Sequence, residues 1–270
     1  MLDVAAIRAQ LGGAGLGASI RALGSVSSTN DVAWAWAEAG CAEGTVVLAE
    51  EQVRGRGRFG RTWHCPRGRG LLMSVVLRPA GEGVGPLHLT AVAAVAVAEA
   101  IEELAGLPAG IQWPNDVTVR DRKVAGVLVE RRGSRASSPC VVGVGVNVNV
   151  GREEFPEELR ERATSLAAEA GRELEVECMA AATLRRLDAL YRQVGAGGWA
   201  AVAAAWRARC SLVGETADVE TEGRLLRGRV VEADPLAGIE LELADGERRQ
   251  CQPDSATRVL PLPTARDRSG

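Results

Sequence analysis

The sequence predicts a mixed α/β fold with a small all-β unit at its C-terminal end. Short valine- and leucine-rich runs, typical of strands, alternate with alanine-rich segments whose apolar residues recur at helical spacing. The chain has 270 residues, 46% of them hydrophobic, so it can bury a full core, and about two domains are expected. After Ser211 the pattern changes to short β-like runs. We therefore expect a main domain over 1–211, a β-barrel over 212–262 and a disordered polar tail over 263–270.

The elements of the main domain are predicted from apolar periodicity and from capping and breaking residues. Thr29 or Asn30 can cap a first helix that ends at Gly40, and Gly106 with Pro108 stops a helix rich in alanine and valine. The expected helices cover about 31–39, 87–104, 157–169, 177–193 and 197–209. The expected strands cover about 45–51, 71–77, 117–120, 123–131 and 140–150, the last two joined as a hairpin around 133–139.

Four further strands are expected in the C-terminal unit. Turn residues separate them at Glu222-Gly223, Asp234-Pro235 and Asp245-Gly246. The strands cover about 216–220, 224–231, 239–243 and 248–252. Short strands at this spacing are typical of a small barrel.

Composition excludes several classes of protein. Six cysteines form no C-x-x-C pair and the two histidines are His64 and His88, so neither a zinc site nor a disulfide framework is indicated. Residues 1–24 lack the apolar core of a signal peptide, and no run reaches the roughly eighteen apolar residues that a membrane span needs. The formal net charge of −3 gives no sign of a nucleic-acid partner. We expect a cytoplasmic protein without a membrane or DNA partner.

An arginine- and glycine-rich loop lies between two predicted strands. Residues 54–70 hold six arginines and five glycines without one aspartate or glutamate. Arginine presents a fork of donors that matches carboxylate and phosphate oxygens, and glycine lets the backbone approach a ligand. Because six guanidinium groups repel one another, we expect an anionic partner there, and a solvated loop is the alternative.

Three other interpretations of the loop fail on its context. The string from Gly55 to Gly60 satisfies G-x-G-x-x-G, but a dinucleotide site must open a helix, and Pro66, Gly68 and Gly70 prevent one. The phosphate-binding string G-x-x-x-x-G-K-[ST] does not occur. Arginine-glycine nucleic-acid tethers are long and belong to basic proteins, which this chain is not.

A second informative stretch begins with Gln112-Trp113-Pro114-Asn115-Asp116. Proline after tryptophan favours an extended turn, and Asn115 and Asp116 offer oxygen ligands. Lys123 follows at the start of a predicted strand, with Gly126 three residues on, an arrangement suited to a bound carboxylate or phosphate. A plain turn, a surface lysine and a β-bulge are the alternatives, and Asp116 could instead pair with Lys123.

These motifs together resemble the biotin protein ligases. The resemblance rests on five motifs, in this order: Ser28-Thr29-Asn30, Gln52 ahead of Gly55-Arg56-Gly57-Arg58-Phe59-Gly60-Arg61, Trp113-Pro114-Asn115-Asp116, Lys123-Val124-Ala125-Gly126 and Gly143-Val144-Gly145-Val146-Asn147-Val148-Asn149. It runs from about residue 25 to 260. Gln112 departs from it, because the family usually has lysine there, and so does Ser27, where an acid is frequent.

The resemblance implies a catalytic domain over 1–211 with a mixed sheet akin to that of class II aminoacyl-tRNA synthetases, and an SH3-like barrel over 212–262. It implies an ATP-dependent ligase that forms biotinyl-5'-AMP and transfers biotin to a lysine of a biotin carboxyl carrier domain, with ATP, Mg²⁺ and biotin as cofactor and substrates. By resemblance the catalytic residues are Lys123, Arg58 and Arg56. Biotin is assigned to Ser28, Thr29, Asn30, Gln52, Arg56, Gly57, Arg58, Lys123 and Gly126, the adenylate to Arg58, Arg61, Trp63, Asn115, Asp116 and Asn147, and a metal to Asp116.

Two rival functions follow from the same resemblance. A lipoate or octanoate ligase or transferase shares the fold, but its apolar ligand would not call for the polar set of Ser28 to Asn30 and Gln52. A biotin-sensing DNA-binding repressor needs an N-terminal winged helix, and the residues before Ser25 are too few for one. We expect the ligase, and a homodimer stays open.

Overall fold

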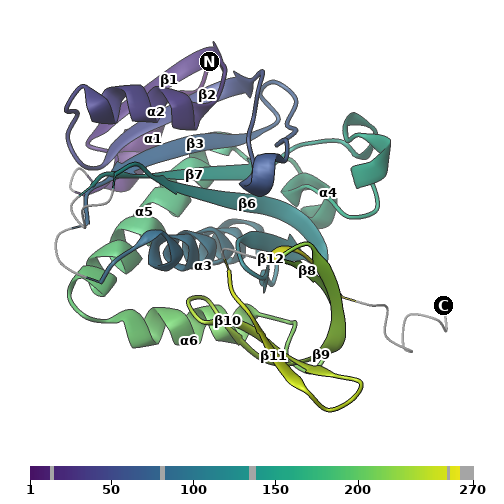
Figure 1. Ribbon diagram of the computed structural model, residues 1–270. Coiled ribbons are helices and arrows are strands. Elements are labelled where there is room, and N and C mark those ends of the chain that lie inside the picture. The colour runs from purple at the N-terminus through teal and green to yellow at the C-terminus, as the bar shows by residue number, and fades with distance from the viewer. Residues whose placement is uncertain (13–14, 80–82, 134–137, 254–255, 262–270) are drawn as a thin grey trace.

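The centre of the protein is a seven-stranded mixed sheet (Figure 1). The computed structural model describes residues 1–12, 15–79, 83–133, 138–253 and 256–261. The strands are β1 (Ser19–Val26), β2 (Thr45–Gln52), β3 (Gly70–Leu77), β4 (Gly110–Gln112), β5 (Asp116–Val119), β6 (Arg122–Arg131) and β7 (Cys140–Asn147). Their order is β1-β2-β3-β7-β6-β5-β4, with β1 parallel to β2 and every other neighbour antiparallel. The expected mixed α/β fold is confirmed.

Helices cover both faces of this sheet. They are α1 (Val4–Leu11), α2 (Thr29–Glu38), α3 (Pro86–Ala105), α4 (Leu166–Ala170), α5 (Val176–Gly195) and α6 (Trp199–Arg209). Helix α2 lies alone on one face, where Trp34 packs against Val47, Val76 and Val141. Helices α3 and α5 cover the opposite face (Figure 1). Most of the buried residues of α3 are alanine and valine, whose small side chains let the helix lie close to the strands.

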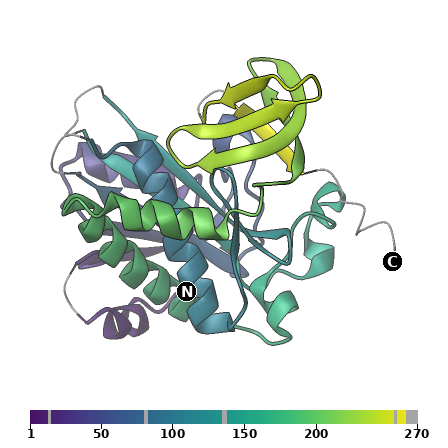
Figure 2. The ribbon, with the colours of Figure 1, turned by 90° about the horizontal axis from the view of Figure 1, so that it is seen from below.

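A second sheet follows α6 in the chain. It comprises β8 (Thr216–Thr221), β9 (Arg224–Asp234), β10 (Gly238–Leu243), β11 (Arg248–Cys251) and β12 (Ala256–Pro261), all antiparallel in the order β11-β10-β9-β8-β12. Trp113 Nε1 donates to the Asp234 carbonyl at 3.4 Å, and Gln112 Nε2 donates to the Val259 carbonyl at 3.2 Å. The sheet therefore lies against the turn that carries residues 112–116 (Figure 2). The predicted tail, 263–270, lies outside the described residues.

Three predictions about elements are wrong. The helix expected over 157–169 is instead a short turn followed by α4, because Thr164 pairs in extended form with Lys123 and Ser165 caps α4 through the Ala168 N–H. The strand expected over 140–150 ends at Asn147. Helix α2 begins at Thr29 after Ser28, and neither Thr29 nor Asn30 caps it, because both side chains have partners elsewhere.

Four elements were not predicted. Helix α1, the edge strands β1 and β4, and β12 are short or carry mixed polar patterns, so apolar periodicity gives little signal for them. The hairpin of β6 and β7 is confirmed by its antiparallel register, although 134–137 lie outside the described residues. In the described ranges no helix is long and apolar enough to cross a membrane.

Candidate active site

A cavity of about 320 Å³ lies beside the arginine-glycine loop, where β6, β7 and the N-terminus of α2 come together. Its lining contains every residue that the sequence proposed for the site: Ser28, Thr29, Asn30, Gln52, Arg56, Gly57, Arg58, Arg61, Trp63, Asn115, Asp116, Lys123, Gly126 and Asn147. These residues come from segments far apart in the chain. The structure thus brings the predicted set together in one place, and the role of each residue stays a prediction.

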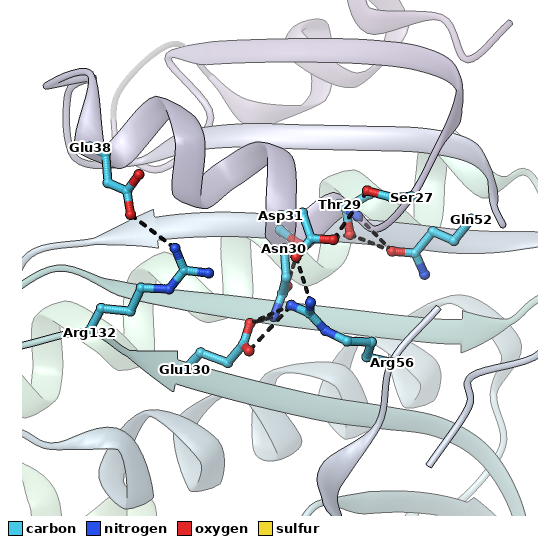
Figure 3. Close-up of polar contacts among 10 residues, drawn as sticks. Ser27, Thr29, Asn30, Asp31, Glu38, Gln52, Arg56, Glu130 and Arg132 are labelled. Atoms are coloured by element: carbon cyan, nitrogen blue, oxygen red, sulfur yellow. Dashed lines mark hydrogen bonds and ion pairs between the residues drawn. The ribbon is translucent and has the colours of Figure 1, made fainter. Parts of the chain in front are cut away.

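One end of the cavity is a network of neutral side chains. Gln52 Oε1 accepts hydrogen bonds from the Thr29 N–H at 2.7 Å and the Thr29 hydroxyl at 2.9 Å (Figure 3). The Ser74 hydroxyl lies 2.8 Å from Thr29 Oγ1 and 2.6 Å from Asn30 Oδ1. Asn30 Nδ2 donates to Glu130 Oε2 at 2.7 Å. Because the oxygen of Gln52 is occupied by Thr29, its amide nitrogen is the group that Gln52 can offer to a ligand.

Arg56 is held by two carboxylates at the same end. Its Nη1 lies 2.6 Å from Asp31 Oδ1, and its Nη2 lies 3.2 Å from Glu130 Oε2. Figure 3 shows the guanidinium between these two acids, with Glu130 also reaching Asn30. We expected an external anion to offset the charge of the loop. Part of that charge is offset from within the protein, because Arg67 also pairs with Glu50 at 2.9 Å.

Arg58 links the loop to the C-terminal sheet. Its Nη2 donates to the Pro253 carbonyl at 2.6 Å, and its guanidinium lies 4.9 Å from the centre of the Phe59 ring. Phe59 has φ 55° and ψ 35°, the left-handed region that non-glycine residues seldom adopt, and its side chain is about half exposed. The backbone of the loop is therefore strained at Phe59, next to the proposed functional residue Arg58.

Lys123 and Asp116 form an ion pair in the lining of the cavity. Lys123 Nζ lies 2.6 Å from Asp116 Oδ1 and 5.5 Å from the centre of the Trp63 ring. Both charged side chains are partly exposed, so the pair is only partly removed from water. Of the two interpretations that the sequence left open for Asp116, the structure contains the pairing with Lys123. Asn115 Nδ2 donates to the Val127 carbonyl at 2.8 Å and so fixes the turn against β6.

Two glycines of β7 make room for functional side chains. A Cβ at Gly145 would lie 2.5 Å from Cε2 of the Trp63 ring, and one at Gly143 would clash with Asn30 Oδ1. Both positions point to the face of the sheet that carries the cavity. The Trp63 indole nitrogen and Asn147 Oδ1 are buried and have no hydrogen-bond partner among the described residues. Buried polar atoms that lack a partner at a cavity are candidates for ligand contact.

Sequence reasoning missed Ser74, Glu130, Gly143 and Gly145 as parts of the site. Ser74 is a lone hydroxyl in an apolar strand, and Glu130 is one charge among several after β6, so neither has a distinctive pattern. The glycines did carry a signal. Two glycines at alternate positions of a strand lie on one face, and this spacing indicates close approach by another group.

The described residues of the site offer few ligands for a metal ion. Asp116 is the only carboxylate among the described residues that line the cavity, and no cluster of three or more potential ligands occurs in the described part of the chain. Magnesium usually takes one or two protein carboxylates and completes its shell with water and substrate phosphates. The donor set thus fits magnesium that is held mainly by the phosphates of a nucleotide, with Asp116 as one ligand.

The sequence matches a known family of protein ligases. A model of the Biotin/lipoate A/B protein ligase family matches residues 23–147. The bifunctional ligase/repressor BirA of Bacillus subtilis is 33% identical over 226 residues, which cover 83% of this chain and 69% of that protein. The chain therefore belongs to the Biotin/lipoate A/B protein ligase family.

Other similar proteins of that family are named as biotin ligases. The biotin--[acetyl-CoA-carboxylase] ligase of Mycobacterium tuberculosis is 34% identical over 233 residues, 82% of each chain. The structure of the biotin protein ligase of Aquifex aeolicus in complex with biotin and ATP superposes with a TM-score of 0.78 at 27% identity, covering 90% of this chain and 99% of that one. The resemblance inferred from the motifs is confirmed.

Proposed function

We propose that the chain is an ATP-dependent ligase that activates biotin as biotinyl-5'-AMP and transfers it to a lysine of a biotin carboxyl carrier domain. The observation that carries this proposal is the polarity of the cavity. One end is a network of neutral donors and acceptors around Thr29 and Gln52 with Arg56 beside it, and the cations Arg58 and Lys123 also line the cavity. The relatives that act on biotin, and the structure with biotin and ATP, support the same assignment.

The neutral end suits the ureido ring of biotin. A ureido group has a carbonyl that needs donors and two N–H groups that need acceptors, and Ser28, Thr29, Asn30 and Gln52 provide both kinds. The first three are almost completely buried, so an unpaired polar group there costs free energy. The dithiolane of lipoate or the chain of octanoate would offer no partner to the Gln52 amide nitrogen, the group that Gln52 has left for a ligand, which favours biotin over the alternative ligands.

The cationic part suits the first chemical step. A carboxylate oxygen of biotin bonds to the α-phosphorus of ATP while the bond to pyrophosphate breaks, and both reactants are anions. Arg56, Arg58 and Lys123 offset their repulsion and the charge that collects on the leaving group, and fixed charges act strongly in a cavity poor in water. Magnesium, when bound with the phosphates, adds charge neutralisation, with Asp116 as its one candidate protein ligand.

In the second step the protein contributes mainly by positioning the two reactants. The amine of the acceptor lysine attacks the acyl carbon, the bond to AMP breaks, and the amine loses a proton as the amide forms. The adenylate is already activated, so alignment of the two reactants accounts for most of the acceleration. Arg61, Trp63, Asn115 and Asn147 line the cavity near Lys123, and we assign them to the adenylate, with Gly57 and Gly126 allowing its close approach.

We also propose a division into a catalytic domain over 1–211 and an SH3-like barrel over 212–262. The five antiparallel strands β8 to β12 support a barrel-like unit. The hydrogen bonds from Arg58 to Pro253 and from Gln112 to Val259 place it beside the site. In this proposal the unit helps to hold the arginine-glycine loop, and it lies where an acceptor domain must approach.

The test is a labelling assay with defined components. The purified protein is incubated with ATP, Mg²⁺, biotin and a biotin carboxyl carrier domain, with lipoate as a competitor, and mass spectrometry identifies the product. We expect biotin on one carrier lysine, with pyrophosphate released in equal amount. Lys123→Ala should slow adenylate formation by about a hundredfold, the scale of one lost transition-state donor. Attachment of lipoate alone would refute the proposal.

A further inference from the structure

Glu169 is a buried carboxylate that does not line the cavity. It lies on α4, and its side chain has no exposed surface. Its Oε1 accepts from the Thr164 hydroxyl at 2.6 Å and from Arg122 Nη2, and its Oε2 lies 3.2 Å from Arg120 Nη1. A carboxylate withdrawn from water is costly unless all its oxygens are bonded, and these three donors satisfy it.

The two arginines lie just before Lys123: Arg120 is in the turn between β5 and β6, and Arg122 is the first residue of β6. This turn joins β5 to β6, and two of its residues, Arg120 and Asp121, have φ 48° and φ 61°. Left-handed backbone at two successive non-glycine residues is uncommon and costs free energy, so it persists where its surroundings hold it. The Glu169 carboxylate bonds to an arginine on each side of Asp121 and so braces the turn.

The third partner, Thr164, contacts the backbone of Lys123. The Thr164 N–H donates to the Lys123 carbonyl at 2.9 Å, and the Lys123 N–H donates to the Arg162 carbonyl at 2.8 Å. The Thr164 carbonyl in turn accepts from Asn147 Nδ2 at 3.1 Å. One buried residue therefore touches, through its hydroxyl and its backbone, the carboxylate of α4 and two proposed functional residues.

We propose that Glu169 is a positioning residue for Lys123 and Asn147. Glu169 fixes the backbone on both sides of Lys123 through Arg120, Arg122 and Thr164. Through Thr164 it also orients the amide of Asn147, whose Oδ1 has no partner among the described residues and can therefore contact a ligand. Of the residues assigned to biotin, Lys123 alone is bonded to this network in the described part of the chain, so we expect the largest effect on adenylate formation. The biotin residues Thr29 and Gln52 have no bond to this network in the described structure. The predicted effect on rates rests on the proposed function, whereas the effect on backbone order does not.

The experiment compares Glu169→Gln with Thr164→Val, which removes the hydroxyl and keeps the shape. Thr164→Ser keeps the hydroxyl and serves as the rescue. Glu161→Gln, at an exposed acid paired with Arg152, is the matched control for loss of a charge. Three quantities are measured: the single-turnover rate of adenylate formation, the biotin Kd without ATP, and the hydrogen exchange of the Lys123 and residue-164 amides by NMR.

We expect Glu169→Gln and Thr164→Val to slow adenylate formation roughly tenfold to a hundredfold, the cost of a small misplacement of a functional group. The biotin Kd should rise by a smaller factor than the adenylation rate falls, because Lys123 is only one of the several residues assigned to biotin. The two amides should exchange at least about tenfold faster in both variants, and at the wild-type rate in Thr164→Ser and in Glu161→Gln.

Unchanged exchange of these amides would overturn the inference, as would equal losses of adenylation rate and biotin affinity. If Glu169→Gln does not fold, Thr164→Val decides, because it breaks the same link without removing a charge. If the wild type forms no adenylate, the proposed function fails, and the exchange measurement still decides whether Glu169 orders Lys123.

Discussion

Replacement of Ser74 by alanine should lower the stability of the protein, because it removes a buried hydroxyl from the hydrogen-bond network around Thr29 and Asn30. The Ser74 side chain is fully buried, and its hydroxyl lies within hydrogen-bond distance of both Thr29 Oγ1 and Asn30 Oδ1. Without it, Asn30 Oδ1 becomes a buried acceptor that lacks a donor. Leaving one buried polar group unsatisfied costs ~1–3 kcal/mol, and we expect the free energy of unfolding to fall by that amount.

The same change should weaken biotin binding, although Ser74 does not line the cavity. If Asn30 turns to find another donor, its bond to Glu130 is lost, and Thr29 loses a partner that helps to orient its hydroxyl toward Gln52. One misoriented group corresponds to about 1.4 kcal/mol, so the biotin Kd, measured by calorimetry without ATP, should rise about tenfold. Chemical denaturation gives the stability in parallel.

Val75→Ala is the matched control. Val75 neighbours Ser74 in β3 but faces the core under α3 and α5, and it is fully buried as well. Its truncation should cost ~1–3 kcal/mol of stability through a cavity and leave the biotin Kd unchanged. An unaltered biotin Kd in Ser74→Ala, at a reduced stability like that of Val75→Ala, would refute the role assigned to the hydroxyl.

Three further predictions concern single residues. Asp116→Asn should slow adenylate formation by about tenfold, because Lys123 loses the partner that fixes it, and a shift in the Mg²⁺ titration instead would identify Asp116 as a metal ligand. Gly145→Ala should raise the KM for ATP by about tenfold, because the added methyl group displaces the Trp63 ring, and steady-state kinetics at saturating biotin would show it. Hydrogen bonds from Arg186 lower the pKa of Glu103 in the folded protein. The ionised Glu103 carboxylate therefore stabilises the fold at pH values above its unfolded pKa, and this stabilisation is lost as the pH falls through the folded pKa. Glu103→Gln should therefore be destabilised at pH 7 and equal to wild type in acid melts.

Much of the site could be predicted because its motifs lie at the ends of strands. Gln52 ends β2, Lys123 is the second residue of β6 and Asn147 ends β7, so each motif follows or precedes an apolar run that the sequence shows clearly. The insertion of β7 between β3 and β6 could not be predicted, since no local pattern encodes strand order. The motifs converge because of that order.

Long-range polar contacts were the part that the sequence could not show. Glu130 pairs with Asn30 and Arg56, and Glu169 pairs with Thr164 and the turn before Lys123. Each is one of 35 acidic residues in the chain, and its role depends on which distant side chain it contacts. The helix predicted over 157–169 failed for a related reason, because backbone pairing with Lys123 overrides its local helical preference.

The internal carboxylates change the interpretation of the arginine-glycine loop. The sequence predicts an external anion for this cluster of guanidinium groups, but Asp31 and Glu130 already pair with Arg56, and Asp116 pairs with Lys123. The loop can therefore fold without a ligand. In the proposed reaction the biotin carboxylate and the nucleotide phosphates must compete with these acids for the cations, and the combined negative charge of the two substrates can offset the loss.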